Sequence, residues 1–417
     1  MSSIATANSA VTPVEAFVAI EQNGATLLPL RKAGLARFSE SGYPTLRDED
    51  WRFTNVKPLS ELPFRPTLIP VDQAIGEEQL SDVIFGQLDA DRLVFVDGHF
   101  SSALSQIADQ SNGVTISNLA NVEVELGSLS AGDDNPFVAL NDAFFTDGAV
   151  IQIADGQRLA KPVHLLFVTT ASEDGDAAHI RNWIFAGTNA QGTIIESHIG
   201  DGANIEHIKF QDQSNRAFHL ASLYSKLGRD AQYGFHSIAL GARLSRNNLR
   251  MRLAQPGIEC VLNGLYMLRG QQLADHHMIV EHAAPHCDSY EYFNGILDEQ
   301  SRGVFHGRIL VQPGAQKTDA KQTNKNLLLS DDATANTKPQ LEIYADDVKC
   351  THGATIGEMD DDAIFYLRAR GLDTPTARRM LLHGFAGEIV ERIRHDAVRE
   401  ELNALVLGRL ETVHKLD

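Results

Sequence analysis

Cysteine is scarce in this chain of 417 residues. The three cysteines are Cys260, Cys287 and Cys350, and an odd number without an export signal argues against a disulfide framework. No arginine precedes Arg31, so the N-terminus lacks the basic stretch of a secretory signal or a transit peptide. The sequence therefore predicts a cytoplasmic protein whose thiols are reduced and available for sulfur or metal chemistry.

Positive charge and long apolar runs are also in short supply. Lysine and arginine total 36 against 55 aspartates and glutamates, a net charge of −19, which repels nucleic acids and anionic lipid surfaces. No apolar run reaches the roughly 18 residues that a membrane span needs. The Gly-x-x-x-x-Gly-Lys-Ser/Thr phosphate loop and the Gly-x-Ser-x-Gly nucleophile elbow are both absent. We expect no nucleic-acid partner, no membrane partner and no ATP hydrolysis by this chain.

The N-terminal part reads as helical. Residues 1 to about 12 are small and polar, and we expect them to form a flexible leader. From Val14 onward apolar residues recur at helical intervals, up to a stop near residues 42 to 44. Trp51 and Phe53 follow as apolar anchors that fasten this unit to the core. The predicted N-terminal helical region, with its leader, is 1–75.

The middle of the chain reads as β-structure. Its short runs are rich in β-branched and aromatic residues, and they include 92–96, 150–153, 163–168 and 192–199. Turn glycines punctuate the segment at Gly202, Gly228, Gly241, Gly257 and Gly270, with spacings of 26, 13, 16 and 13 residues. A propeller would repeat a signature every 40 residues or so, whereas uneven spacing favours the irregular rungs of a β-helix. We therefore predict a mainly β fold with a β-helix core over 76–357.

After Gly357 the pattern is helical again. Asp360, Asp361 and Asp362 stand where acidic residues favour a helix N-terminus. Thr374 and the proline after it are predicted to start the next helix. Two apolar stripes follow at spacings of three and four, at Ala377, Met380, Leu381, Phe385, Ile389, Val390 and Ile393, and at Val398, Leu402, Leu405, Val406, Leu410 and Val413. The predicted C-terminal helical domain is 358–417, with part of the stripes packed on the core and the rest forming a docking face.

One segment places a thiol and an imidazole close together. Residues 340–357 read Gln-Leu-Glu-Ile-Tyr-Ala-Asp-Asp-Val-Lys-Cys-Thr-His-Gly-Ala-Thr-Ile-Gly. Because side chains at i and i+2 of a strand share a face, Cys350 and His352 are predicted to project from the same side. Thiolate and imidazole are donors that iron, iron-sulfur clusters and zinc accept. Two donors do not close a site, so either another chain supplies the remaining ligands or the pair has no metal role.

Several motifs together resemble the SufD family of iron-sulfur cluster assembly proteins. Segment 315–330 reads Ala-Gln-Lys-Thr-Asp-Ala-Lys-Gln-Thr-Asn-Lys-Asn-Leu-Leu-Leu-Ser, and Thr-Lys-Pro leads at 337 into the segment with Cys350 and His352. Similar matches are the Asp-His-His-Met-Ile-Val-Glu-His-Ala-Ala-Pro-His run at 275–286, Phe-Tyr-Leu-Arg-Ala-Arg-Gly at 365–371, Ala-Arg-Arg-Met-Leu at 377–381, and Pro-Thr-Leu-Arg-Asp-Glu-Asp-Trp-Arg-Phe-Thr at 44–54. They cover nearly the whole chain in order. The sister family, SufB, does not usually carry the Asp-Val-Lys-Cys-x-His-Gly-Ala-Thr wording.

The resemblance implies a fold and a role. The fold would be a right-handed parallel β-helix flanked by helical units. The role would be that of a non-catalytic scaffold subunit, which pairs with SufB and binds the ATPase SufC through the C-terminal helices. Cys350 and His352 would lie at the contact with SufB and share a transient iron-sulfur cluster there, with no tightly bound cofactor in the isolated chain. A homodimer is a further expected state of the isolated chain.

Two other readings stay open. His276, His277, His282 and His286 crowd one segment beside Cys287, and they would supply ligands if the chain were an independent metal-binding β-helix protein. Against this, Ile279 and Val280 predict a strand there, and histidines in a β-helix often form hydrogen-bonded ladders between rungs.

Cys260, among apolar neighbours, is predicted to be a buried small hydrophobe. A β-helix carbohydrate lyase or esterase is disfavoured because such enzymes are commonly exported.

Overall fold

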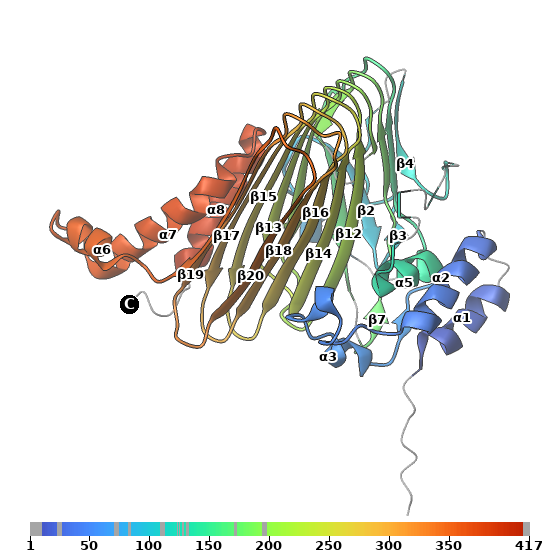
Figure 1. Ribbon diagram of the computed structural model, residues 1–417. Helices are drawn as coiled ribbons and strands as arrows, with labels where there is room; N and C mark the ends of the chain where they lie inside the picture. Colours follow the sequence, from blue (N-terminus) through green and yellow to red (C-terminus); the bar gives the residue numbers. More distant parts are fainter. Residues whose placement is uncertain are drawn as a thin grey trace, which may run out of the picture.

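The computed structural model describes residues 11–411, apart from 23–26, 71–74, 82–84, 109–112, 123, 125, 127–128, 131–132, 171–172 and 194–197. The predicted leader therefore lies almost wholly outside the described residues, as do the end of the last apolar stripe and part of the strand predicted at 192–199. The main body is a long coil of strands with helices on two sides (Figure 1).

Two long sheets form the coil. One has nine strands in the order β20-β18-β16-β14-β12-β10-β8-β5-β4, and the other has seven in the order β21-β19-β17-β15-β13-β11-β9. From β8 to β21 successive strands alternate between the sheets, and neighbours within each sheet are parallel except for β4 and β5. This arrangement confirms the predicted parallel β-helix, while its right-handed sense stays a prediction.

The strands lengthen toward the C-terminal end of the coil. The nine-stranded sheet consists of β4 (Val114–Asn118), β5 (Ala149–Ile153), β8 (Trp183–Ala186), β10 (His198–Ile199), β12 (Phe218–Leu227), β14 (Leu244–Leu253), β16 (Leu273–His282), β18 (Arg302–Val311) and β20 (Thr334–Ile343). The seven-stranded sheet consists of β9 (Gln191–Thr193), β11 (Asn204–Gln211), β13 (Gln232–Ala239), β15 (Glu259–Leu268), β17 (Asp288–Leu297), β19 (Asp319–Leu328) and β21 (Lys349–Gly357).

The core lies between the two sheets. Alternate residues of each strand point inward, and residues such as Phe235, Leu262, Met278 and Phe305 are all but fully buried there. The predicted turn glycine Gly257 sits at a corner with φ of +80°, where an added Cβ would come within 1.9 Å of Asp230 Oδ1. Glycine is therefore required at this corner.

The parallel coil begins near residue 149 rather than at 76. The preceding region combines short helices with a small sheet of order β3-β2-β6, and it includes a helix, α5, that the sequence pattern did not predict. Its elements, with two strands inserted later, are α1 (Pro13–Gln22), α2 (Leu28–Ser41), η1 (Glu49–Trp51), α3 (Lys57–Ser60), β1 (Arg65–Pro66), α4 (Glu77–Ser81), β2 (Asp91–Val96), β3 (His99–Phe100), α5 (Pro136–Phe144), β6 (Val163–Val168) and β7 (Asp176–Ala177).

Three helices follow the coil: α6 (Asp361–Arg368), α7 (Thr374–Val390) and α8 (Asp396–Glu411). Asp360 caps α6 as predicted, because its side chain accepts hydrogen bonds from the backbone of the next turn. The cap of α7 is Asp373 rather than Thr374, because the Asp373 side chain accepts a hydrogen bond from the backbone N–H of Thr376. No helix in the described part of the chain is both long and apolar enough to cross a membrane.

Most of the predicted C-terminal stripes pack on the coil. Leu382, Ile389 and Leu402 join Leu265 and Ile296 in one buried cluster, so α7 and α8 cover the outer face of the seven-stranded sheet (Figure 1). The N-terminal helices lie on the opposite side of the coil. The apolar side chains that remain exposed after this packing are few, and they define where a partner could dock.

Candidate functional site

Cys350 and His352 lie on the last rung of the coil. Both belong to β21, which pairs in parallel with β19 so that Cys350 is opposite Ala320 and His352 is opposite Gln322. Paired residues of parallel strands point to the same side, and Ala320 and Gln322 are buried on the inner side of the coil. Both candidate ligands therefore face the coil interior, yet His352 is exposed and Cys350 only half-buried, because no further rung covers them.

The Cys350 thiol sits at the margin of a small apolar cluster. It packs against a cluster that includes Ile309, Val311 and Ala320. Burial raises the pKa of Cys350, and a hydrogen bond with the backbone of Ala320 partly opposes that shift. The thiol is therefore protonated at neutral pH, and a metal ion would have to displace its proton to bind.

Both sheets end at this rung. β20 is the last strand of the nine-stranded sheet and β21 the last of the seven-stranded sheet, so each has one edge that pairs with no described strand. Such edges present unpaired backbone donors and acceptors to a partner strand. Two large apolar side chains beside these edges, Tyr344 and Ile356, are 62% and 48% exposed. This open end is a surface suited to another β-structure.

The predicted histidine-rich segment does not form one ligand set. β16 directs His276 and His282 into the coil, where they hydrogen-bond to Ser237 at 3.0 Å and Ser289 at 2.8 Å. Burial lowers the pKa of His276 to about 3 and that of His282 to about 4. These two histidines are thus neutral rungs of a hydrogen-bonded ladder, as one of the two sequence readings predicted.

Neighbouring residues of this segment point elsewhere. His277 faces outward, and His286 occupies a corner turn with φ of 58°. Cys287 is buried, and its thiol donates to the backbone oxygen of Gln255 at 3.2 Å. Cys260 is fully buried, which confirms its predicted role as a small hydrophobe.

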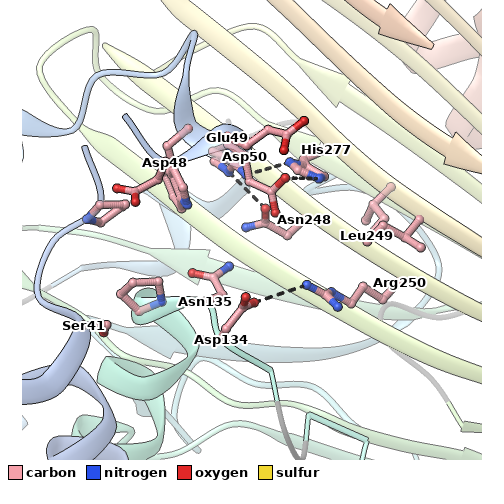
Figure 2. A pocket seen from close by; sticks show the side chains of 15 residues that line it. Ser41, Asp48, Glu49, Asp50, Asp134, Asn135, Asn248, Leu249, Arg250 and His277 are labelled. Carbon is pink, nitrogen blue, oxygen red and sulfur yellow. Dashed lines mark hydrogen bonds and ion pairs between the residues drawn. The ribbon is translucent and has the colours of Figure 1, made fainter. Parts of the chain in front are cut away.

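A second polar site lies where the N-terminal motif meets the coil. Residues 48–51 and residues of β14 and β16 line a pocket of about 410 Å³, and Figure 2 shows Asp50 directed at His277 and Asp134 directed at Arg250. Beside it, Arg246 donates to Asp275 Oδ2 at 2.5 Å and to the backbone oxygen of Asp50 at 2.7 Å. The sequence patterns did not single out this buried ion pair.

Asp50, His277 and His306 are candidate metal ligands by distance alone, since one ligand atom of each lies within 4.8 Å of the others. Arg246 Nη2, however, donates to Nδ1 of His277 at 2.8 Å, and arginine has no acceptor. Nδ1 must therefore be the unprotonated nitrogen, which leaves the hydrogen on Nε2, the nitrogen nearest Asp50. A metal at Nε2 would force a proton onto Nδ1 against the guanidinium, so these residues suit a structural contact better than a metal site.

Trp51 makes this contact an anchor for the N-terminal region. Its ring lies under the guanidinium of Arg246, with 3.7 Å between the guanidinium carbon and the ring centroid, and it packs against Phe137. Thr54 adds a hydrogen bond to Asp275 at 2.5 Å. The predicted anchoring role of Trp51 is confirmed, and Phe53 is only half-buried.

Comparisons with known proteins match most of the chain to one group. The family model described as "SUF system FeS cluster assembly, SufBD core domain" matches residues 151–385, and that described as "SufBD protein N-terminal region" matches residues 15–165. The two matches overlap over residues 151–165, close to where the parallel coil begins.

Individual relatives agree with these matches. An iron-sulfur cluster assembly SufBD family protein of Synechocystis is 34% identical over 400 residues, covering 88% of this chain and 87% of its own. The iron-sulfur cluster assembly protein SufD of Escherichia coli is 32% identical over 409 residues, covering 94% of this chain and 95% of its own. The chloroplastic protein ABCI7 of Arabidopsis thaliana is 26% identical over 418 residues, covering 91% of this chain and 86% of its own.

Proposed function

Because the chain belongs to the SufBD family of iron-sulfur cluster assembly proteins, we propose that it is a non-catalytic scaffold subunit of the SufD kind. It pairs with a SufB-like subunit, binds a SufC-like ATPase and works in the cytoplasm. The observation that carries the proposal is the position of Cys350 and His352 on the last, uncovered rung of the coil. The cluster itself is cargo, held only while it is assembled.

The open end supports the choice of partner. The unpaired edges of β20 and β21 fit the end of a second coil, which would continue both sheets across the contact. A subunit bound there would place its own ligand side chains next to Cys350 and His352. It would thereby complete a ligand set to which this chain contributes two residues. The same edges allow two copies of this chain to pair when it is isolated.

Anaerobic reconstitution with iron and sulfide tests this role. We expect the visible absorption of an iron-sulfur cluster only when this chain and the SufB-like subunit are present together, because neither edge alone closes the ligand set. Equal absorption from this chain alone would favour the independent metal-binding function instead. A chain with His276→Ala and His282→Ala serves as the control, since those histidines lie inside the coil and hydrogen-bond to Ser237 and Ser289.

The ATPase is proposed to dock on the C-terminal helices. Phe365, Tyr366 and Met380 are 72%, 56% and 51% exposed, although most other apolar side chains of α6 to α8 are covered. An exposed aromatic beside covered neighbours is a typical anchor for a partner groove. The chain has no phosphate loop, so the energy of ATP hydrolysis has to come from this partner.

Replacing the anchor Phe365 is expected to weaken capture of the SufC-like subunit by more than about 2 kcal/mol, roughly a 30-fold rise in Kd. Isothermal titration of Phe365→Ala against the ATPase measures this. Val18→Ala on α1 is the matched control, because Val18 is 49% exposed but lies in the N-terminal region. Point variants are preferable to deleting α6 to α8, which would uncover the apolar face of the seven-stranded sheet. Unchanged affinity of Phe365→Ala would move the docking site away from α6.

A further inference from the structure

Two polar side chains lie directly beneath His352 inside the coil. Gln322 on β19 is the register partner of His352, and Glu291 on β17 is the register partner of Gln322. Successive rungs are about 4.8 Å apart, so the three side chains form a column on the inner side of the sheet. The next two residues of the column are the apolar Leu262 and Phe235, which separate the polar residues near the open end from His207 on β11.

The Gln322 amide is held in one orientation. Its Nε2 donates to Glu291 Oε2 at 2.7 Å, and both side chains are almost completely buried. Gly307, on the opposite sheet, gives them room, because an added Cβ there would lie 2.1 Å from Gln322 Nε2. With its nitrogen turned toward Glu291, the amide directs its oxygen away from that carboxyl, where it can serve as a hydrogen-bond acceptor.

That oxygen has no partner. Oε1 of Gln322 is buried and accepts no hydrogen bond from any described residue. Buried polar atoms are nearly always paired, and each exception asks for an explanation. The side chain in register on the uncovered side is His352, which is free to change its rotamer because no rung follows it.

We propose that Gln322 is a positioning residue for His352, a role that rests on the proposed function. When one ring nitrogen of His352 binds iron, the other donates its hydrogen to Oε1 of Gln322. Histidine ligands usually make such a contact, which fixes the tautomer and the ring orientation. Glu291 in turn accepts a hydrogen bond from the Gln322 amide. In the proposed arrangement the carboxyl therefore orients the amide, and the amide orients the imidazole.

The environment of Glu291 is consistent with a held amide. Burial raises the pKa of Glu291 to about 7, and the hydrogen bond from Gln322 opposes that shift. On β15 the thiol of Cys260 faces the same region, and burial also raises its pKa. An apolar residue of the same size would stabilise the coil at least as well as a buried carboxyl without a cation. This argues that Glu291 serves the site rather than the stability of the fold.

Cobalt binding to the full-length chain tests the role, with Co²⁺ alone as the probe and visible absorption as the measurement. Gln322→Leu is expected to weaken Co²⁺ binding about 10- to 100-fold, whereas Gln322→Glu keeps an acceptor oxygen and, because the two carboxyls at this place share a proton, should restore part of the affinity. Gln340→Leu is the matched control, because Gln340 lies on β20 at the same end but pairs with His306, and its affinity should stay at the wild-type value.

A second variant and a second readout keep the role separate from folding. Glu291→Leu removes the acceptor that holds the amide and places there the residue type of the next rung, Leu262; it should weaken Co²⁺ binding in the same direction. With Zn²⁺ bound, ring ¹⁵N NMR should show the non-ligating N–H of His352 protected from exchange in the wild type and unprotected in Gln322→Leu.

The outcomes that overturn the role are distinct. If His352→Ala loses Co²⁺ binding while Gln322→Leu and Glu291→Leu bind like the wild type, Gln322 does not position His352, and the proposed function stands. If His352→Ala binds Co²⁺ like the wild type, the His352 site itself is wrong and the positioning role falls with it.

Discussion

Cells that depend on this chain for iron-sulfur clusters are expected to lose nearly all cluster-enzyme activity when Cys350 and His352 are both replaced by alanine. The two side chains are the only sulfur and imidazole donors on the uncovered rung of β21. In the proposed complex, their removal would leave the SufB-like subunit without ligands from this side. The measurement is the activity of an iron-sulfur enzyme, such as aconitase, in a strain that carries the variant as its only copy.

The fold should survive this change. His352 is exposed and Cys350 is half-buried, and substitutions at such positions usually change stability little. Thr351→Ala is the control, because Thr351 lies between them and points to the other face of β21. The single variants then separate their roles, and full activity of the double variant would exclude the open end as the assembly site.

Arg246→Ala is expected to destabilise the chain by about 3–5 kcal/mol, because it leaves the carboxylate of Asp275 buried without its cation. The Arg246 and Asp275 side chains are 2% and 1% exposed, and Oδ1 of Asp275 already has no hydrogen-bond partner among the described residues. The stacking on Trp51 is lost as well. Urea unfolding measures the effect. The signal is the fluorescence of Trp51, in a chain where Trp183→Phe removes the other tryptophan.

A surface ion pair supplies the comparison for this variant. Arg216 and Asp174 are 79% and 67% exposed, and Arg216→Ala should change the free energy of unfolding by no more than about 1 kcal/mol. Arg246→Lys should recover only part of the loss, since an ammonium group cannot reproduce the planar stacking or the forked hydrogen bonds. A loss below about 1 kcal/mol for Arg246→Ala would show that the N-terminal region is anchored elsewhere.

Local patterns in the sequence predicted what depends on near neighbours. The shared face of Cys350 and His352 follows from the period of two in a strand, and the cap at Asp360 follows from the hydrogen-bonding chemistry of its carboxylate. The amphipathic stripe of α7 likewise predicted a helix. It could not show which surface the stripe covers, and most of it proved to pack on the coil.

Contacts between rungs were beyond such patterns. Glu291, Gln322 and His352 are brought into one column by strands about 30 residues apart, and the corner lengths that decide this register vary along the chain. Arg246 and Asp275 meet for the same reason. Helix α5 was missed because it interrupts a stretch of strand-like runs and is only nine residues long.

The two ends of the coil are not equivalent, and this limits how many chains can join. At the C-terminal end β20 and β21, of ten and nine residues, leave parallel edges open. At the other end, the nine-stranded sheet finishes in the five-residue β4, which runs antiparallel to β5. The parallel pairing that a second coil would have to continue is therefore broken there. A chain with only one open end uses that end when it pairs. Assembly through this surface therefore stops at two coils and does not continue into a fibre.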